Sequence, residues 1–138
     1  MSAFTITQRV RFGHVDPAGI AYYPRIYDYI HEAFEELWEV HVGVRYYHLL
    51  GERRIGFPLV RSEADFKHPL RFGDEPRVRV SCFHLGRSSL GLRYVYEVGG
   101  TRCVDARMTT ACIELDSMRT LPIPEEYRAR FAAILESP

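Results

Sequence analysis

The sequence is dominated by alternation of apolar and polar residues with a period of two, interrupted by one long segment of helical period. The alternation predicts strands at residues 4–12, 60–67, 77–82, 90–98 and 104–109. In the last of these the apolar phase slips after Thr110, which predicts a bulge or bend at that point. Short turn sequences, among them Gly99-Gly100, join the last four strands, so we expect an antiparallel meander.

The segment of helical period lies between the first strand and the meander. Its apolar residues form one stripe, made of Ile26, Ile30, Ala33, Leu37 and Val40. Pro24 suits the first helical turn, and we expect the helix to fade by Gly43. A second, short helix is predicted at 125–135. All five strands are expected to turn their apolar residues toward the long helix, so the fold class is α+β: a five-stranded antiparallel sheet wrapped around one long central helix, with a short C-terminal helix.

Length and charge limit the partners of this chain. Its 138 residues are the length of one domain, so residues 1–138 are interpreted as a single domain. The formal net charge of +0 argues against long nucleic acids and anionic membranes as partners. The charges are unevenly spread, however: residues 25–40 carry one Arg against five acids, and residues 77–107 carry six Arg against two acids. A local basic patch is therefore compatible with one phosphate-bearing ligand.

The sequence gives no indication of secretion, a membrane span or a metal. The N-terminus lacks the apolar stretch of a signal peptide, and no apolar run reaches the roughly 18–20 residues of a membrane span. Cys82, Cys103 and Cys112 lie in apolar stretches without ligand spacing, so we expect buried, reduced thiols in a cytoplasmic protein. The histidines form no ligand set either. We expect neither a metal nor a cofactor.

The chemistry is expected in the loop that joins the first strand to the long helix. A helix N-terminus presents unpaired backbone N–H groups and the positive end of its dipole, which can polarise a carbonyl or hold an oxyanion. Asp16 lies a few residues before this terminus, in a turn shaped by Pro17 and Gly19. A carboxylate beside an oxyanion site suits hydrolysis of an acyl compound. The alternative is structural, because an Asp before Pro-Ala-Gly is commonly a turn residue that bonds its own backbone.

The same stretch resembles a known signature. Asp16-Pro17-Ala18-Gly19-Ile20, followed by Tyr23-Pro24 and an amphipathic helix, is similar to the motif of the 4-hydroxybenzoyl-CoA thioesterase family, whose members are hot-dog-fold acyl-CoA thioesterases. The resemblance extends through 61–69, the meander and 121–124, and so covers most of the chain. It implies a hot-dog fold, in agreement with the order of strands and helix predicted from the periodicity.

The resemblance also implies roles for individual residues. Asp16 matches the family's carboxylate, which acts as nucleophile or as general base for water. The backbone N–H of Tyr23 matches the donor that polarises the thioester carbonyl, and Gly19 matches the turn glycine. The turn Gly86-Arg87-Ser88 matches a hairpin that often helps to bind the CoA nucleotide, although a solvated arginine is the alternative for Arg87. Because the family works at dimer interfaces, a homodimer or tetramer is expected, with the active sites at the dimer interface.

Several other side chains are candidates for contact with substrate. Tyr22 and Tyr23 are candidates to line a pocket for an aryl or short apolar acyl group, whereas we expect Tyr27 to pack against the core stripe. His14 is a candidate for binding substrate or acting as a base, with a partly buried loop histidine as the alternative. A second carboxylate is available from the long helix, but a solvated acidic face is the expected role of its three central acids, Glu32, Glu35 and Glu36.

We therefore expect an acyl-CoA thioesterase that hydrolyses an aroyl-CoA, such as a 4-hydroxybenzoyl-CoA-like thioester, or a short-chain acyl-CoA to free acid and CoA. Coenzyme A is then part of the substrate and not a cofactor. Two alternatives stay open: a non-catalytic module that binds acyl-CoA or an acyl carrier protein, and a hot-dog hydratase or dehydratase. The intact Asp16 motif counts against the first. The second needs an acid–base pair, for which the long helix offers only His31.

Overall fold

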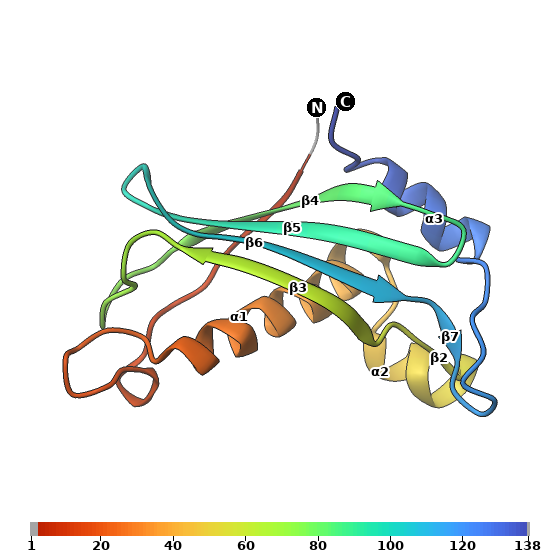
Figure 1. Ribbon diagram of the computed structural model, residues 1–138, viewed down its shortest axis with the longest axis horizontal. Helices are drawn as coiled ribbons and strands as arrows, with labels where there is room; N and C mark the ends of the chain where they lie inside the picture. The colour runs from red at the N-terminus through yellow and green to blue at the C-terminus, as the bar shows by residue number, and fades with distance from the viewer. Residues whose placement is uncertain (1–2, 138) are drawn as a thin grey trace.

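A computed structural model describes residues 3–137. Its main feature is a five-stranded antiparallel sheet, in the order β1-β4-β5-β6-β3, wrapped around one long helix (Figure 1). The strands are β1 (Phe4–Thr7), β3 (Leu59–Phe66), β4 (Arg77–Leu85), β5 (Ser89–Val98) and β6 (Thr101–Ala111). Two short strands, β2 (Ile55–Gly56) and β7 (Ile113–Glu114), pair in a small separate sheet. The arrangement is the hot-dog fold that was expected.

The long helix α1 (Tyr23–Glu36) continues through a π-helical segment, Leu37–Val42, and stops at Gly43, whose φ of 93° ends it in the left-handed region. The predicted end at Gly43 is confirmed. The predicted stripe is wrong at Val40, which is 63% exposed, whereas Trp38 is fully buried. The π-helical turn holds more residues than an α-helical turn and so rotates the buried stripe around the helix.

Two shorter helices follow. The C-terminal helix α3 (Glu125–Ala132) confirms the one predicted at 125–135, with an earlier end. The helix α2 (Tyr46–His48), with its extension Leu49–Arg53, was not predicted. It is short and contains Gly51, so it carries no clear helical period.

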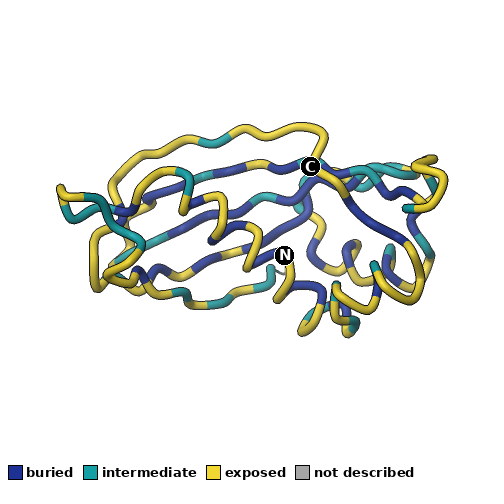
Figure 2. Tube along the Cα trace, turned by 90° about the horizontal axis from the view of Figure 1, so that it is seen from below, coloured by how far each residue is buried: buried dark blue, intermediate teal, exposed yellow. Residues whose placement is uncertain are grey.

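The core lies between α1 and the three central strands. Val80, Tyr94 and Ala106 face one another across β4, β5 and β6 and are all buried. Figure 2 shows these strands as largely buried, whereas β3 runs exposed along one edge. Gly99 and Gly100 form the predicted hairpin turn, with φ values of 55° and 82° that favour glycine.

Two strand predictions are wrong in the extent or burial of the strand. The first strand ends at Thr7, and Phe12 lies in a 3-10 turn with 77% of its surface exposed. The strand predicted as half-buried, β3, is an edge strand whose Val60 and Phe66 are 62% and 48% exposed. The predicted irregularity near Thr110 is confirmed, because the β3–β6 register shifts opposite this residue.

Candidate active site

The loop before α1 is a closed turn built from backbone hydrogen bonds. The Asp16 N–H donates to the Ile20 carbonyl and the Gly19 N–H donates to the Asp16 carbonyl, each at 2.9 Å. Gly19 has a φ of +81°, a conformation that a side chain would strain. Pro17 and Ala18 lie exposed at the tip of the turn.

The Asp16 side chain plays the structural role that the sequence offered as an alternative, and it keeps one oxygen free. Its Oδ1 accepts the Ala18 N–H at 2.8 Å. Among residues 3–137, no hydrogen bond reaches its Oδ2. The carboxylate is partly buried, so one oxygen holds the group in place while the other is available to a reacting atom.

His14 links this loop to the helix. Its Nδ1 lies 2.8 Å from the hydroxyl of Tyr29 and 3.3 Å from the Arg11 N–H. Because both partners are placed to donate to Nδ1, the neutral ring carries its proton on Nε2. The His14 carbonyl accepts the Tyr22 N–H at 3.1 Å, so one residue connects the Asp16 turn to the start of α1. The contact between His14 and Tyr29 was not predicted from the sequence.

The start of α1 presents an unused donor. Tyr22 is the N-cap, in extended conformation, and Pro24 follows Tyr23 within the first turn. In the part of the chain that the structure describes, the Tyr23 N–H makes no backbone hydrogen bond. The rings of Tyr22 and Tyr23 are more than half exposed and meet edge to face at 5.3 Å between centroids.

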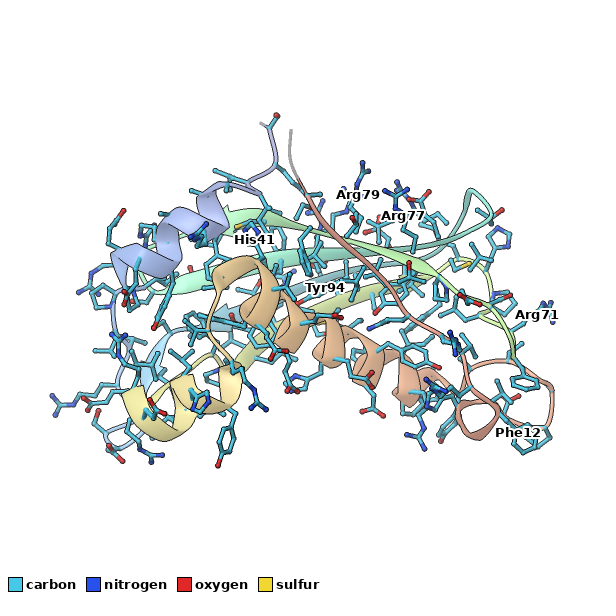
Figure 3. All side chains as sticks on the ribbon, turned by 180° about the vertical axis from the view of Figure 1, so that it is seen from behind. Phe12, His41, Arg71, Arg77, Arg79 and Tyr94 are labelled. Carbon is cyan, nitrogen blue, oxygen red and sulfur yellow. The ribbon has the colours of Figure 1, made fainter. Side chains whose placement is uncertain are left out.

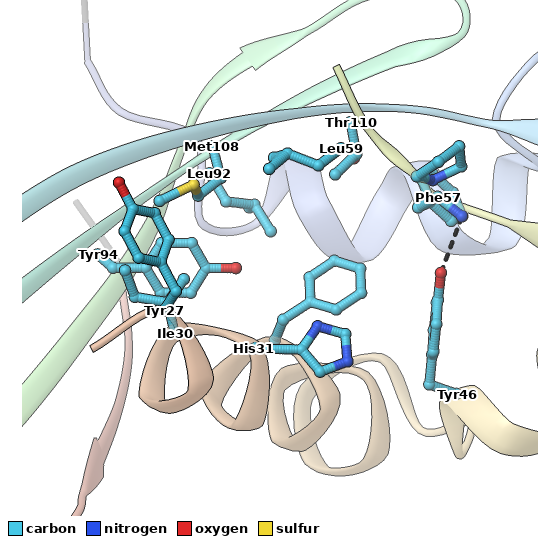
Figure 4. Close-up of a pocket in the computed structure, with 12 residues that line it drawn as sticks. Tyr27, Ile30, His31, Tyr46, Phe57, Leu59, Leu92, Tyr94, Met108 and Thr110 are labelled. Atoms are coloured by element: carbon cyan, nitrogen blue, oxygen red, sulfur yellow. Dashed lines mark hydrogen bonds between the residues drawn. The ribbon is translucent and has the colours of Figure 1, made fainter. Parts of the chain in front are cut away.

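Two adjoining hollows follow the groove between α1 and the edge strand β3. The first, of about 430 Å³, is lined by Ile20, Tyr23, Ile26 and Phe66 among others. The second, of about 380 Å³, is mostly apolar and includes Tyr27, Phe34 and Tyr94 (Figure 4). Phe66 of the first hollow and Tyr27 of the second are in contact, with 6.5 Å between their ring centroids. Tyr27 therefore lines a cavity instead of packing into the core stripe as expected.

The predicted nucleotide-binding turn lies at the other end of the sheet from the Asp16 loop (Figure 1). The Arg87 side chain is exposed, while backbone hydrogen bonds from Cys112 to the Ser88 carbonyl and from Ile123 to the Arg87 carbonyl hold the turn. Arg128 of α3 donates to the carbonyls of Gly86 and Arg87 at 2.6 and 3.2 Å. Within one chain, Arg87 and Ser88 are thus not brought to Asp16.

The other residues considered from the sequence take structural or surface positions. His31 pairs with Glu35 at 3.0 Å on α1 and also lines the cavity beside Tyr27 (Figure 4). The three cysteines are buried and free, as predicted. Across the described residues, no group of three or more His, Cys, Asp or Glu side chains is placed to hold a metal ion. Within the same residues, no helix has the length and apolar character needed to cross a membrane.

Comparison with known proteins identifies the family. The model of the thioesterase-like superfamily matches residues 10–131, which include the Asp16 loop, α1 and the whole main sheet except β1. The chain belongs to the thioesterase-like superfamily. The predictions of a hot-dog fold and of a thioester hydrolase are both confirmed.

Individual relatives are similar over nearly the whole chain. A 1,4-dihydroxy-2-naphthoyl-CoA hydrolase of Thermosynechococcus vestitus is 29% identical over 121 residues, which cover 87% of this chain and 82% of that protein. A thioesterase superfamily structure from Jannaschia sp. CCS1 matches with a TM-score of 0.91 and 28% identity, covering 99% and 95% of the two chains. A gentisyl-coenzyme A thioesterase matches with a TM-score of 0.81 and 29% identity over 94% of this chain and 99% of that one.

Proposed function

We propose that this protein is an acyl-CoA thioesterase of the 4-hydroxybenzoyl-CoA thioesterase type, acting on an aroyl-CoA or a short-chain acyl-CoA. The observation that carries the proposal is that a held carboxylate, Asp16, lies in the loop that leads to the unused N–H of Tyr23 at the start of α1. Similarity to hydrolases of 1,4-dihydroxy-2-naphthoyl-CoA and gentisyl-CoA supports an aromatic acyl group.

In the proposed reaction the thioester carbonyl oxygen accepts the Tyr23 N–H, and charge develops on that oxygen as the carbonyl carbon is attacked. The helix dipole and the N–H stabilise this charge. Asp16 either attacks the carbon directly or removes a proton from the attacking water. The carbon–sulfur bond then breaks, and one water in all is consumed to give free acid and CoA thiol. Tyr22 and the Nε2–H of His14 flank this site as substrate contacts, and Pro17 and Gly19 shape the loop.

The proposed assembly is a homodimer or tetramer joined along β3. This edge strand exposes Leu59, Val60 and Phe66, and an unpaired strand edge favours pairing with another strand. A two-fold axis through the middle of β3 brings the Asp16 loop of one protomer to the same end as the Gly86-Arg87-Ser88 turn of the other. Arg87 and Ser88 can then contact the CoA nucleotide, which completes a site that one chain leaves divided.

A panel of acyl-CoA thioesters, read out as released thiol, tests the function. We expect wild-type protein to hydrolyse at least one aroyl-CoA or short-chain acyl-CoA. The Asp16→Asn variant keeps the oxygen that accepts the Ala18 N–H but loses the charge, so kcat should fall by about 10²–10⁴-fold with KM little changed. Wild-type rates in this variant contradict the mechanism, and no turnover of any thioester by wild type contradicts the function.

A further inference from the structure

On its sheet side, the cavity beside Tyr27 contains a polar group that makes no hydrogen bond within the described residues. Tyr94, on β5, is 1% exposed, and its hydroxyl points into the cavity (Figure 4). Among the described residues, no hydrogen bond is made by this hydroxyl. Burial alone raises the pKa of Tyr94, with no contribution from a hydrogen-bond partner or a neighbouring charge.

Two other tyrosines in this part of the fold have partners for their hydroxyls. The Tyr46 hydroxyl, at the far wall of the cavity, accepts the Phe57 N–H at 2.8 Å. The Tyr29 hydroxyl lies 2.8 Å from the His14 ring nitrogen. A buried polar group without a partner is destabilising, since it has lost its hydrogen bonds to water. The Tyr94 hydroxyl is not one of the fully sealed unpartnered atoms of the described residues, so it is open to the cavity, where a group of a ligand can take the place of water as its hydrogen-bond partner.

The sheet leaves room for that partner next to Tyr94. In the strand register Tyr94 lies beside Ala106 on β6, and Ala106 lies beside Ala64 on β3. The cavity itself opens on the other side of Tyr94, where Leu92, Met108 and Thr110 form its sheet wall. Figure 3 shows Tyr94 between the sheet and α1, far from the exposed tip at Phe12.

The remaining walls suit a flat ring. Phe34 and Tyr27 on α1 supply aromatic faces and edges, and Leu92 and Met108 on the sheet supply apolar contact. An aliphatic chain could fill such a space but would leave the Tyr94 hydroxyl unpaired. A ring that carries a hydroxyl group fills the space and provides the missing hydrogen bond.

We propose that this cavity holds the acyl group of the substrate and that Tyr94 is its specificity-determining residue, selecting a hydroxylated aromatic ring through a hydrogen bond to the ring hydroxyl. The inference rests on the proposed function and narrows it. The thioester lies at the helix N-terminus, in the hollow that contains Tyr23, and the ring enters the adjoining cavity past Tyr27. Sites built to hydrogen-bond a substrate hydroxyl discriminate strongly against analogues that lack it.

Matched pairs of thioesters test this assignment: gentisyl-CoA against benzoyl-CoA, and 1,4-dihydroxy-2-naphthoyl-CoA against 2-naphthoyl-CoA. Wild type should prefer the hydroxylated member of at least one pair in kcat/KM. Tyr94→Phe keeps the ring and removes only the oxygen. It should lower kcat/KM for that hydroxylated member by about 3–10-fold and leave the plain member unchanged or slightly faster.

Tyr96→Phe is the matched control. Tyr96 lies two residues along the same face of β5, is fully buried and also has an unpartnered hydroxyl, but it does not line the cavity. Its variant should leave the preference intact. Shifts in melting temperature with the free acids, gentisate against benzoate, measure recognition without turnover and should show the same loss in Tyr94→Phe.

The outcomes separate the two proposals. If wild type hydrolyses aroyl-CoAs but Tyr94→Phe slows both members of each pair equally, or if Tyr96→Phe alters the preference as much, the role of Tyr94 is overturned. A wild-type preference for plain rings or aliphatic thioesters overturns it as well. If wild type hydrolyses none of the thioesters in either panel, the proposed function itself fails.

Discussion

The two ends of the sheet are built differently, although the proposed site needs both. At the Asp16 end, local backbone hydrogen bonds shape a turn within residues 16–20, and His14 ties it to α1. At the other end, the Gly86-Arg87-Ser88 turn is held by residues distant in sequence, including Arg128. The first end presents the carboxylate of Asp16 and the backbone N–H of Tyr23, whereas the turn at the second end presents the exposed side chain of Arg87.

This difference suggests a division of labour. Groups at the Asp16 end touch the reacting carbonyl in the proposed mechanism, so changes there should appear in kcat. Groups at the Arg87 end can contact only the remote nucleotide, and only from the second protomer, so changes there should appear in KM. A variant at the Asp16 end that changes only KM, or a variant at the Arg87 end that changes only kcat, contradicts this division.

After loss of the Asp16 charge, the largest expected effect comes from removing the Tyr23 N–H. Tyr23→Pro deletes this donor at a position where helices accept proline, and the extended conformation of Tyr22 suits a residue before proline. We expect kcat to fall by about 10²–10³-fold, the range found for loss of one oxyanion donor. Steady-state kinetics on the best thioester of the panel provide the measurement.

Tyr23→Ala is the control for this variant, because it removes the same side chain and keeps the N–H. Its kcat should stay within a few-fold of wild type. Equal losses in the two variants mean that the tyrosine ring, not the backbone donor, matters. Circular dichroism checks that α1 still forms in both.

A smaller effect is expected at the Arg87 end. Arg87→Ala removes the exposed cation of the turn and should raise KM for CoA thioesters by about 3–10-fold, with kcat unchanged. The difference from wild type should shrink as salt is added, since exposed charges are screened. Arg79→Ala, which removes an exposed arginine from the outer sheet face (Figure 3), should leave KM unchanged.

The smallest effect on activity is expected from loss of the ion pair between Arg93 and Asp105, which lies between the two ends of the sheet. Arg93 donates to both carboxylate oxygens of Asp105, at 2.9 and 2.7 Å, and holds the pKa of this carboxyl below its usual range. Because the pKa of Asp105 is lower in the folded state than in the unfolded state, the ionised carboxyl stabilises the fold. This stabilisation is fully present above the unfolded pKa of about 3.9 and is lost as the pH falls through the lower pKa of the folded state. Asp105→Asn should lower the free energy of unfolding by about 1–3 kcal/mol at pH 7 and leave kcat unchanged.

Urea unfolding at pH 7 and near pH 3 measures this effect. The difference in unfolding free energy between wild type and Asp105→Asn should narrow at the lower pH, because the unfolded carboxyl, with an ordinary pKa of about 3.9, is by then mostly protonated and must lose that proton on folding. A gap that stays constant with pH means that the ion pair is not its source.

Periodicity and short motifs predicted most of the fold, because they report local backbone preference and burial. They located α1, the meander, the Gly99-Gly100 turn and the loop with Asp16. They failed at Val40, where a π-helical turn changes the phase, and at β3, where an alternating pattern faces an open edge. Alternation shows which residues share a face of a strand, but not whether anything covers that face.

The features of the candidate site also divide into those that the sequence predicted and those that it did not. The sequence by itself determined the Asp16 turn and the helix start, since both depend on residues close together in the chain. Only the tertiary structure decided that Tyr29 contacts His14, that Arg87 lies far from Asp16 in one chain, and that the Tyr94 hydroxyl faces a cavity. The reason is physical: local hydrogen bonding follows from neighbouring residues, whereas a cavity and its unpaired hydroxyl arise where separate elements meet. The sequence placed Tyr94 only on the apolar face of the strand at 90–98 and did not distinguish it from its neighbours there.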